Sequence, residues 1–387
     1  MAARRLWGVL LALVLAVLPL SGAGAFQNVS PVAAWKPPGT LLAYEPMTLP
    51  GVFRAKAWRI LYATRDFLGR PTLSSGMVVM SGYAPADPRQ RRIVAWAHQT
   101  SGIARKCAPS QKSDGINSIL GISDLVAGGY IVAASDYPGL GTDGQVGYLV
   151  GKGQANAVID SVRAARQIPG VGGGNRYALW GYSQGGHAAL FASLFDSSYA
   201  PELNLVGVAA VSPPTNLSLL MRTGLDSIEG HIFGSYIVGS WTKKYGISDA
   251  ALTDPDVRPV IDKINLRCVN KTSDLLKILK QEKGLREKFL QRSPMDIPEW
   301  RTAVTLNSIS SLSGRIPTII FQGSSDTIVN PAVTSAIVQE SCRYGATAKY
   351  VILPGAGHSG AAKASVTQAV NWITDRFAGR PAPSSCR

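Results

Sequence analysis

A serine flanked by glycines, placed between an apolar strand and a helix of small residues, constrains this chain more than any other feature. The segment 181–185 reads Gly-Tyr-Ser-Gln-Gly; an apolar stretch at 177–180 precedes it, and Gly-His-Ala-Ala-Leu follows it. A turn this sharp leaves almost no room for side chains two positions before and two positions after the serine, so glycine occupies both. The pattern therefore predicts that Ser183 projects from the end of a strand at the start of a helix.

Strands and helices are predicted to alternate along most of the chain. Two segments on either side of Gly69-Arg70-Pro71 are typical of an antiparallel pair, and the later strands are nearly continuous apolar runs, as expected of strands buried on both faces. This alternation predicts an α/β fold, with a mostly parallel sheet and helices on both faces. The predicted strands are 55–63, 76–82, 92–98, 130–135, 177–180, 205–211, 317–322 and 350–353, and the predicted helices include 117–127, 154–167 and 361–377.

One long segment breaks this alternation. Residues 215–315 are helix-like and lack the pattern of a buried strand, which predicts a helical cap inserted into a core of residues 26–214 and 316–387. Within that segment, 228–241 is apolar and contains glycine. It is a candidate lid or acyl-chain wall, and ordinary packing inside the cap explains it equally well. Residues 26–50 are rich in proline and are predicted to form an irregular arm.

The N-terminus has the pattern of a secretory signal peptide. Arg4 and Arg5 precede an apolar run at 6–20, and the sequence Ala-Gly-Ala ends at Ala25. The run is short for a membrane span, so we predict a signal peptide over 1–25, cleavage after Ala25 and a secreted, extracellular protein.

Export makes disulfides favourable for the four cysteines. Four cysteines allow three pairings. We favour Cys107–Cys268 and Cys342–Cys386, because the second pair would fix the C-terminal tail. The chain shows no C-x-x-C motif or cysteine and histidine cluster, and therefore no metal site is predicted.

The chain is basic, with a formal net charge of +15. Its lysines and arginines are scattered, and no nucleic-acid motif is present, so nucleic acid is not the expected partner. A basic exported protein suits peripheral contact with an anionic lipid interface or the cell envelope. The oligomeric state cannot be inferred from this pattern.

A serine nucleophile needs a base, and the chain offers four histidines. His98 ends a strand far upstream of Ser183, and His231 lies in the predicted cap. His187 lies one helical turn after the serine, where its ring would point along the helix rather than over the hydroxyl. His358 lies in a glycine-rich loop after the last strand, where it can reach the serine, and we predict it as the base.

The base in turn needs a carboxylate to orient it. Asp326 follows the strand before His358, and the chain order Ser183, Asp326, His358 is that of α/β-hydrolases. Asp136, which also follows a strand, is the alternative acid, but its Asp-Tyr-Pro-Gly setting is more typical of a structural turn.

A serine of this kind also needs hydrogen-bond donors for the oxyanion of the tetrahedral intermediate. The backbone N–H of Gln184, directly after the nucleophile, is one candidate. The other is expected in the loop after strand 92–98, where Gln99 or Thr100 would supply an N–H and Thr100 could add its hydroxyl. We assign the oxyanion hole to Gln184 and Thr100.

Five segments spread over the chain form a more specific pattern than the serine motif alone. They are Pro-Gly-Thr-Leu-Leu at 38–42, Ala-Trp-Ala-His at 95–98, Cys-Ala-Pro-Ser at 107–110, Asp-Tyr-Pro-Gly-Leu-Gly at 136–141 and the segment 181–188. Through these motifs, residues 37–378 resemble the secretory lipase family, of the lipase A type found in fungi and in exported proteins of actinobacteria. The resemblance implies an α/β-hydrolase fold with a helical cap, and hydrolysis of lipid or other acyl esters without a cofactor. It also places Ser183, Asp326 and His358 at the positions of the family's triad.

One departure from the family affects the oxyanion loop. Similar bacterial members usually carry His-Gly-Thr where this chain has His98-Gln99-Thr100. The added side chain of Gln99 is expected to narrow the acyl site or to shift the backbone beside it.

The predicted function is therefore that of a secreted serine esterase or lipase acting on acyl or lipid esters. Two alternatives stay open at this point. The same triad would serve an acyltransferase that moves an acyl group onto a cell-envelope alcohol. A binding protein could also use a hydrolase scaffold without catalysis, although the intact set of serine, aspartate and histidine argues against it.

Overall fold

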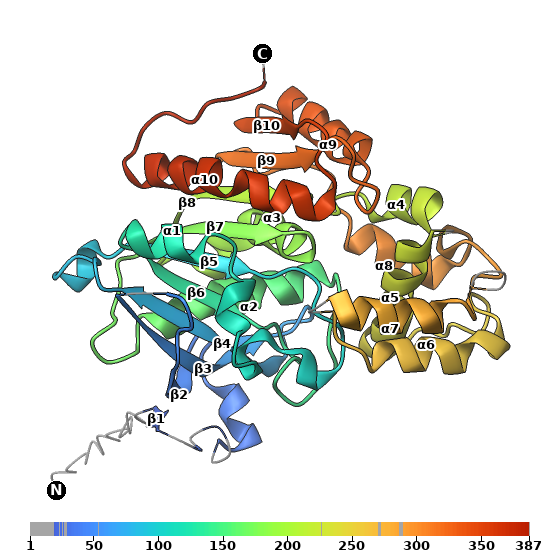
Figure 1. Cartoon of the computed structure of the whole chain (residues 1–387), viewed down its shortest axis with the longest axis horizontal. Coiled ribbons are helices and arrows are strands. Elements are labelled where there is room, and N and C mark those ends of the chain that lie inside the picture. The colour runs from blue at the N-terminus through green and yellow to red at the C-terminus, as the bar shows by residue number, and fades with distance from the viewer. Residues whose placement is uncertain are drawn as a thin grey trace, which may run out of the picture.

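One ten-stranded mixed sheet organises the molecule (Figure 1). The computed structural model describes residues 19–386, except 23, 25, 27–28, 53, 226, 270–271 and 286–288. The strand order is β1-β2-β3-β4-β6-β5-β7-β8-β9-β10; β2, β3, β4 and β6 pair antiparallel, and the strands from β6 to β10 pair parallel. The strands are β1 Leu20–Ser21, β2 Leu41–Met47, β3 Ala55–Arg65, β4 Pro71–Ser81, β5 Ile93–Ala97, β6 Ile131–Ser135, β7 Arg176–Tyr182, β8 Asn204–Val211, β9 Thr318–Gly323 and β10 Ala348–Leu353.

Helices cover both faces of the sheet, as the sequence predicted. Successive residues of β5 point to opposite faces: Ala95 belongs to one hydrophobic core and Trp96 to the other, and both are fully buried. No helix in the described parts of the chain is long and apolar enough to cross a bilayer. The first core is covered by α2 Gly151–Ala165, α3 Gln184–Tyr199 and α9 Pro331–Arg343, and the second by α1 Ile122–Ala127 and α10 His358–Phe377.

The structure corrects two elements that were predicted in the N-terminal third of the chain. The 26–50 segment is not wholly irregular, because Leu41–Met47 forms β2 and pairs with β3. Its prolines obscured the strand, yet a strand near the sheet edge tolerates Pro46. The helix predicted over 117–127 begins only at Ile122, because Gly121 has φ +69° and separates it from a 3₁₀ turn at Gly115–Ser118.

A group of helices lies between β8 and β9, and we call residues 212–317 the helical insertion. Figure 1 shows these helices beyond one end of the sheet. They form a third hydrophobic core, in which the rings of Trp241 and Trp300 stack with centroids 6.0 Å apart. Apart from an isolated bridge at Cys268, no strand occurs among the insertion's described residues. The helices are α4 Leu217–Gly224, α5 Ile228–Tyr245, α6 Arg258–Asn265, α7 Thr272–Glu282 and α8 Pro298–Leu306.

The two favoured disulfides are both present. Cys107–Cys268 joins the loop after β5 to the helical insertion, beside the bridge between Gly102 and Cys268. Cys342–Cys386 ties the C-terminal tail to α9. The first disulfide therefore links the helical insertion to the rest of the molecule, and the second holds the C-terminal tail against the part that contains the sheet.

Candidate active site

The sharp turn after β7 holds Ser183 in a strained backbone conformation. Its φ of +54° and ψ of −120° lie in a region that residues other than glycine rarely adopt. A Cβ added at Gly181 would collide with the Gly185 carbonyl, and one at Gly185 would collide with the Ala97 carbonyl. The two glycines therefore let α3 press against the end of β5, and this contact exposes the serine at the sheet edge.

Ser183, His358 and Asp326 meet at the carboxyl ends of β7, β10 and β9. Ser183 Oγ lies 2.9 Å from His358 Nε2, and His358 Nδ1 lies 2.8 Å from Asp326 Oδ2. These distances fit a serine hydroxyl that donates to a neutral imidazole, whose other N–H donates to the carboxylate. Ser183 is partly exposed, whereas the Asp326 side chain is fully buried. The structure thus brings together the three residues that the sequence singled out.

Four donors hold the Asp326 carboxylate. Oδ1 accepts the backbone N–H groups of Ile328 at 3.0 Å and Val329 at 2.9 Å, while Oδ2 accepts from His358 and from Gln322 Nε2 at 3.0 Å. Burial alone would raise the pKa of this carboxyl, but the hydrogen bonds from His358 and the backbone, and the attraction of the His358 ring in its protonated form, outweigh burial and lower the pKa. Asp326 is therefore ionised at neutral pH and can orient the ring of His358.

Two other histidines serve different parts of the structure. His187 is completely buried, and its Nε2 lies 2.8 Å from the Asn307 carbonyl oxygen. Burial lowers the pKa of His187 to about 4, against a smaller opposing effect of Asn307, so its ring stays neutral. His231 pairs with Glu282 inside the helical insertion, at 2.7 Å. Each is held by these partners, away from the Ser183 hydroxyl.

His98 and the alternative acid Asp136 support the loop after β5. The ring nitrogens of His98 lie 2.6 Å from the Gln99 carbonyl oxygen and 3.1 Å from that of Asp136. The Asp136 carboxylate accepts from Ser75 Oγ at 2.6 Å and from the Ser110 N–H at 2.9 Å. Asp136 therefore joins two loops to β4, whereas Asp326 contacts His358.

The predicted oxyanion residues lie at the point where the strand order reverses. β5 and β7 are neighbours in the sheet, and Ala97 pairs with Gly181 at their carboxyl ends. Thr100 follows β5 and Gln184 begins α3, so both lie beside Ser183 around one pocket. Ligands of open α/β sheets bind in the crevice at such a reversal. The sheet topology thus brings Thr100 and the start of α3 to the pocket that Ser183 lines.

Gln99 is not among the residues that line the pocket of Ser183, whereas its neighbour Thr100 is. Gln99 instead lines a separate hollow with His98 and Asn117. The narrowing that the sequence suggested is therefore not seen, and the alternative, a shift of the loop backbone, stays a prediction.

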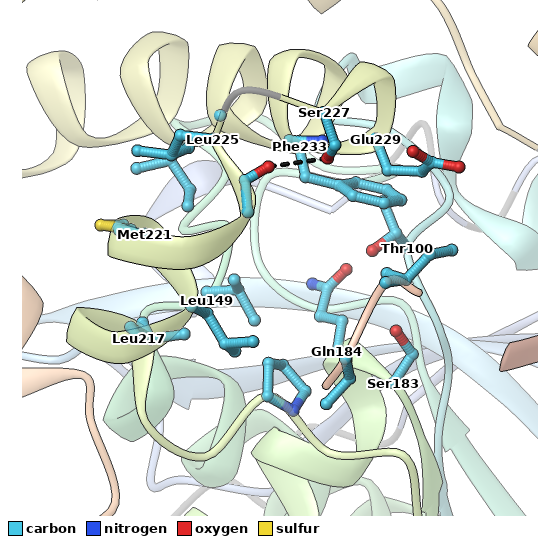
Figure 2. A pocket seen from close by; sticks show the side chains of 18 of the residues that line it. Thr100, Leu149, Ser183, Gln184, Leu217, Met221, Leu225, Ser227, Glu229 and Phe233 are labelled. Atoms are coloured by element: carbon cyan, nitrogen blue, oxygen red, sulfur yellow. Dashed lines mark hydrogen bonds between the residues drawn. The ribbon is translucent and has the colours of Figure 1, made fainter. Parts of the chain in front are cut away.

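A mainly apolar pocket, with a cavity volume of about 100 Å³, extends from Ser183 into the helical insertion. Figure 2 shows Leu149, Leu217 and Met221 on the side opposite Ser183 and Thr100. Residues of α5 both line this pocket and pack in the insertion's own core, so both interpretations of 228–241 describe part of that helix. The lining includes Thr100, Tyr148, Leu149, Ser183, Gln184, Leu217, Leu220, Met221, Leu225, Phe233, Ile237 and Val329.

Sequence reasoning missed two polar residues that support the site. Gln322 is a buried amide in an otherwise apolar strand, and that polarity is a signal that could have singled it out. Tyr148 lies in the loop between β6 and α2 and places its hydroxyl 3.0 Å from Thr100 Oγ1. No motif or periodicity marks Tyr148, because its partner comes from a distant loop.

The fold and the arrangement of Ser183, His358 and Asp326 define an α/β-hydrolase. Among solved structures, lipase A of Candida antarctica in its closed state matches with a TM-score of 0.75 at 18% identity, over 90% of this chain and 85% of that one. The rice cell wall degrading esterase LipA of Xanthomonas oryzae matches with a TM-score of 0.68 at 20% identity, over 88% and 98%. These likenesses confirm the predicted fold class.

Sequence comparison gives the family. The secretory lipase family model matches residues 113–385, and the chain belongs to this family. Lipase 5 of Candida albicans is 25% identical over 86% of this chain and 74% of its own length. The secreted triacylglycerol lipase LIP4 of Malassezia globosa is 24% identical over 90% and 79%. The chain is therefore a carboxylic ester hydrolase that acts on lipid or other esters, and an extracellular location is consistent with the family and with the two disulfides.

Proposed function

We propose that this chain hydrolyses acyl esters of lipids, such as acylglycerols, through a Ser183-His358-Asp326 triad and an acyl-enzyme intermediate. The observation that carries the proposal is the continuous hydrogen-bonded path from Ser183 Oγ to His358 and on to Asp326, at 2.9 Å and 2.8 Å. The path begins at the mouth of an apolar pocket, where an acyl chain would be buried.

The reaction proceeds in two halves. His358 Nε2 accepts the Ser183 proton as Oγ attacks the ester carbonyl, and the tetrahedral intermediate collapses when His358 gives that proton to the leaving alcohol oxygen. Water then attacks the acyl-enzyme and passes one proton to His358. The proton returns to Ser183 Oγ as the free acid leaves. Asp326 stays ionised throughout and stabilises the imidazolium that forms in both halves.

Charge develops on the former carbonyl oxygen in both halves. The backbone N–H of Gln184, at the start of α3, supplies one hydrogen bond to that oxygen, and Thr100 supplies the other. The apolar residues of α4 and α5 exclude water from the acyl chain and strengthen these hydrogen bonds. In this assignment the sheet edge performs the chemistry and the helical insertion receives the acyl chain.

The proposal extends to domain organisation and export. Residues 26–214 and 316–387 form the catalytic core and 215–315 the cap, close to the boundaries of the helical insertion. Residues 1–25 act as a signal peptide; most of them, including 1–18 and Ala25, lie outside the described residues. The net charge of +15 favours peripheral contact with an anionic lipid interface or cell envelope.

One experiment tests this function directly. The purified protein is assayed on p-nitrophenyl esters of graded acyl length and on a triacylglycerol, with Ser183→Ala as the matched control, and labelled with a fluorophosphonate. We expect hydrolysis and stoichiometric labelling of the wild type, and neither in the variant. Equal activity of Ser183→Ala would refute the assignment. Loss of free-acid release in favour of ester formation when an alcohol is added would identify an acyltransferase instead.

A further inference from the structure

A hydrogen bond between two buried hydroxyls lies beside the proposed oxyanion hole. Tyr148 Oη and Thr100 Oγ1 are 3.0 Å apart, and the two residues are only 3% and 8% exposed. Both line the pocket that holds Ser183. Thr100 comes from the loop after β5, whereas Tyr148 comes from the loop between β6 and α2, so the pairing exists only in the folded chain.

We propose that Tyr148 is a positioning residue for the oxyanion hole: it donates to Thr100 Oγ1 and so directs the Thr100 hydroxyl hydrogen toward the developing oxyanion. This inference rests on the proposed function, because it requires Thr100 to contact the reacting carbonyl oxygen. Tyr148 itself acts only through Thr100.

The direction of this hydrogen bond follows from the chemistry of the two hydroxyls. Each carries one hydrogen, so Thr100 can donate to the oxyanion only if it does not donate to Tyr148. Burial raises the pKa of Tyr148 well above its ordinary value, so its O–H remains a donor at every working pH. When the oxyanion forms, it is the strongest acceptor nearby, and the order Tyr148 to Thr100 to oxyanion uses both hydrogens. Hydrogen bonds in such a chain polarise and strengthen each other.

The helical insertion holds Tyr148 in place. The Tyr148 N–H donates to Ser240 Oγ at 2.9 Å, and Trp241 Nε1–H donates to the Tyr148 carbonyl oxygen at 2.8 Å. Its ring packs edge-on against Tyr236, with centroids 5.7 Å apart. These three partners all belong to α5, which also lines the acyl pocket through Phe233. The same helix therefore fixes the acyl wall and, through Tyr148, one donor of the oxyanion hole.

A donor of this kind acts mainly in the transition state. The carbonyl oxygen of a bound ester is a weak acceptor, whereas the oxygen of the tetrahedral intermediate is charged. Loss of the Tyr148 hydroxyl should therefore lower kcat and leave KM nearly unchanged. A merely structural tyrosine would change stability or KM instead.

The test is a double-mutant cycle at these two hydroxyls. Tyr148→Phe, Thr100→Val and the double variant are assayed for kcat and KM on p-nitrophenyl butyrate, and for inhibition by a trifluoromethyl ketone that forms a hemiketal oxyanion with Ser183. We expect Thr100→Val to lower kcat about 100-fold and Tyr148→Phe about 10-fold. The double variant should fall no further than Thr100→Val, because Tyr148 has nothing left to position. Affinity for the ketone should fall in parallel with kcat.

Matched controls separate positioning from packing. Tyr130→Phe removes another buried tyrosine hydroxyl, which lies 2.7 Å from Thr374 Oγ1 in the second hydrophobic core and does not line the pocket, and it should leave kcat unchanged. Thr100→Ser keeps the hydroxyl and should keep most of the activity. If Tyr148→Phe does not fold, Ser240→Ala loosens Tyr148 while keeping its hydroxyl, and it should lower kcat several-fold.

The outcomes distinguish this inference from the function on which it rests. Normal kcat in Tyr148→Phe, or in its substitute Ser240→Ala, together with a large loss in Thr100→Val would overturn the role of Tyr148 and leave the proposed function intact. Fully additive losses in the double variant would also overturn it. Normal kcat in both single variants would remove Thr100 from the oxyanion hole as well, whereas activity in Ser183→Ala would overturn the triad itself.

Discussion

The proposed catalytic edge of the sheet and the helical insertion differ in what holds their residues in place. At the edge, Ser183 and Asp326 follow β7 and β9, which are paired parallel on both sides, and His358 follows β10, which pairs parallel with β9. The described residues of the insertion form no such ladder, and packing around rings such as Trp241 holds its helices together. The edge can therefore hold polar side chains within hydrogen-bond distance of each other, whereas the insertion supplies an apolar wall to the pocket.

This contrast suggests that the edge carries out the chemistry and that the insertion selects the acyl chain. Polar groups at the edge are paired and oriented, as the four donors to Asp326 show. The insertion faces the same pocket mainly with aliphatic and aromatic side chains of α4 and α5. Apolar contacts are non-directional, so the side chains of α4 and α5 that line the pocket can be replaced without disturbing the chemistry. The shape of the pocket can therefore vary independently of the triad.

The largest expected effects come from removing His358 and His187 one at a time, which tests whether the first serves catalysis and the second stability. His358→Ala should lower turnover about 10⁴-fold or more and change the melting temperature less than His187→Ala does, because the ring lies at the rim of the site whereas the His187 ring is completely buried. His187→Ala should do the reverse: it leaves a cavity and an unpaired Asn307 carbonyl, which cost about 2–4 kcal/mol of stability. Turnover and thermal melts of both variants check this. A greater loss of turnover in His187→Ala would mean that the base has been misassigned.

Removing each disulfide in turn tests how strongly the insertion and the C-terminal tail are held to the core. Cys107–Cys268 spans 161 residues and joins the insertion to the core, whereas Cys342–Cys386 spans 44 residues within the core. Loop entropy predicts a loss of about 5 kcal/mol when both cysteines of the first pair are changed to serine and about 4 kcal/mol for the second. Urea unfolding measures the losses, and limited proteolysis locates the opened segment. Only the first variant should be cut faster within 212–317; faster cutting there in the tail variant would contradict this.

The buried carboxyl of Asp160 is expected to make the free energy of unfolding depend on pH. Burial raises the pKa of Asp160 to about 6 against opposing hydrogen bonds from Thr64 and Tyr199 and the charge of Arg163. Between about pH 4 and 6 the folded state therefore holds a proton that the unfolded state releases. Stability should fall by about 3 kcal/mol as pH rises through that range, and stay level above it.

Asp160→Asn tests this sign. The variant cannot titrate at this position, so its unfolding free energy should lack that fall between pH 4 and 6. Chemical denaturation at half-unit pH steps compares it with the wild type. Parallel curves for the two proteins would show that Asp160 is not the titrating group.

The smallest expected effect concerns the acyl wall. Phe233→Ala should raise the ratio of kcat/KM for a dodecanoate ester over a butyrate ester several-fold, because a half-buried ring leaves the pocket. Leu306→Ala is the control, since Leu306 lies on α8 and is 63% exposed. Its ratio should match the wild type. An equal shift in both variants would show that the pocket between α4 and α5 does not select the acyl chain.

Much of the catalytic edge could be predicted because its signals are local. The glycines around Ser183 report a steric requirement within five residues, and both Asp326 and His358 stand directly after apolar strands. The strand β2 escaped prediction because Pro46 and the prolines that flank the strand contradict a strand locally, while pairing with β3 overrides this signal. The place of Gln99 also escaped prediction, since the path of the loop rather than residue type decides that it lines a separate hollow.

The chain alone determined the order of its elements, the α/β class, the elbow at Ser183 and the residues able to form a triad. Each follows from sterics or burial over a few neighbouring positions. Only the tertiary structure decided that Tyr148 meets Thr100, that Gln322 supports Asp326 and that α4 and α5 wall the pocket. Those contacts depend on how separate elements dock, and docking is set by packing over the whole molecule, which no short stretch of sequence encodes.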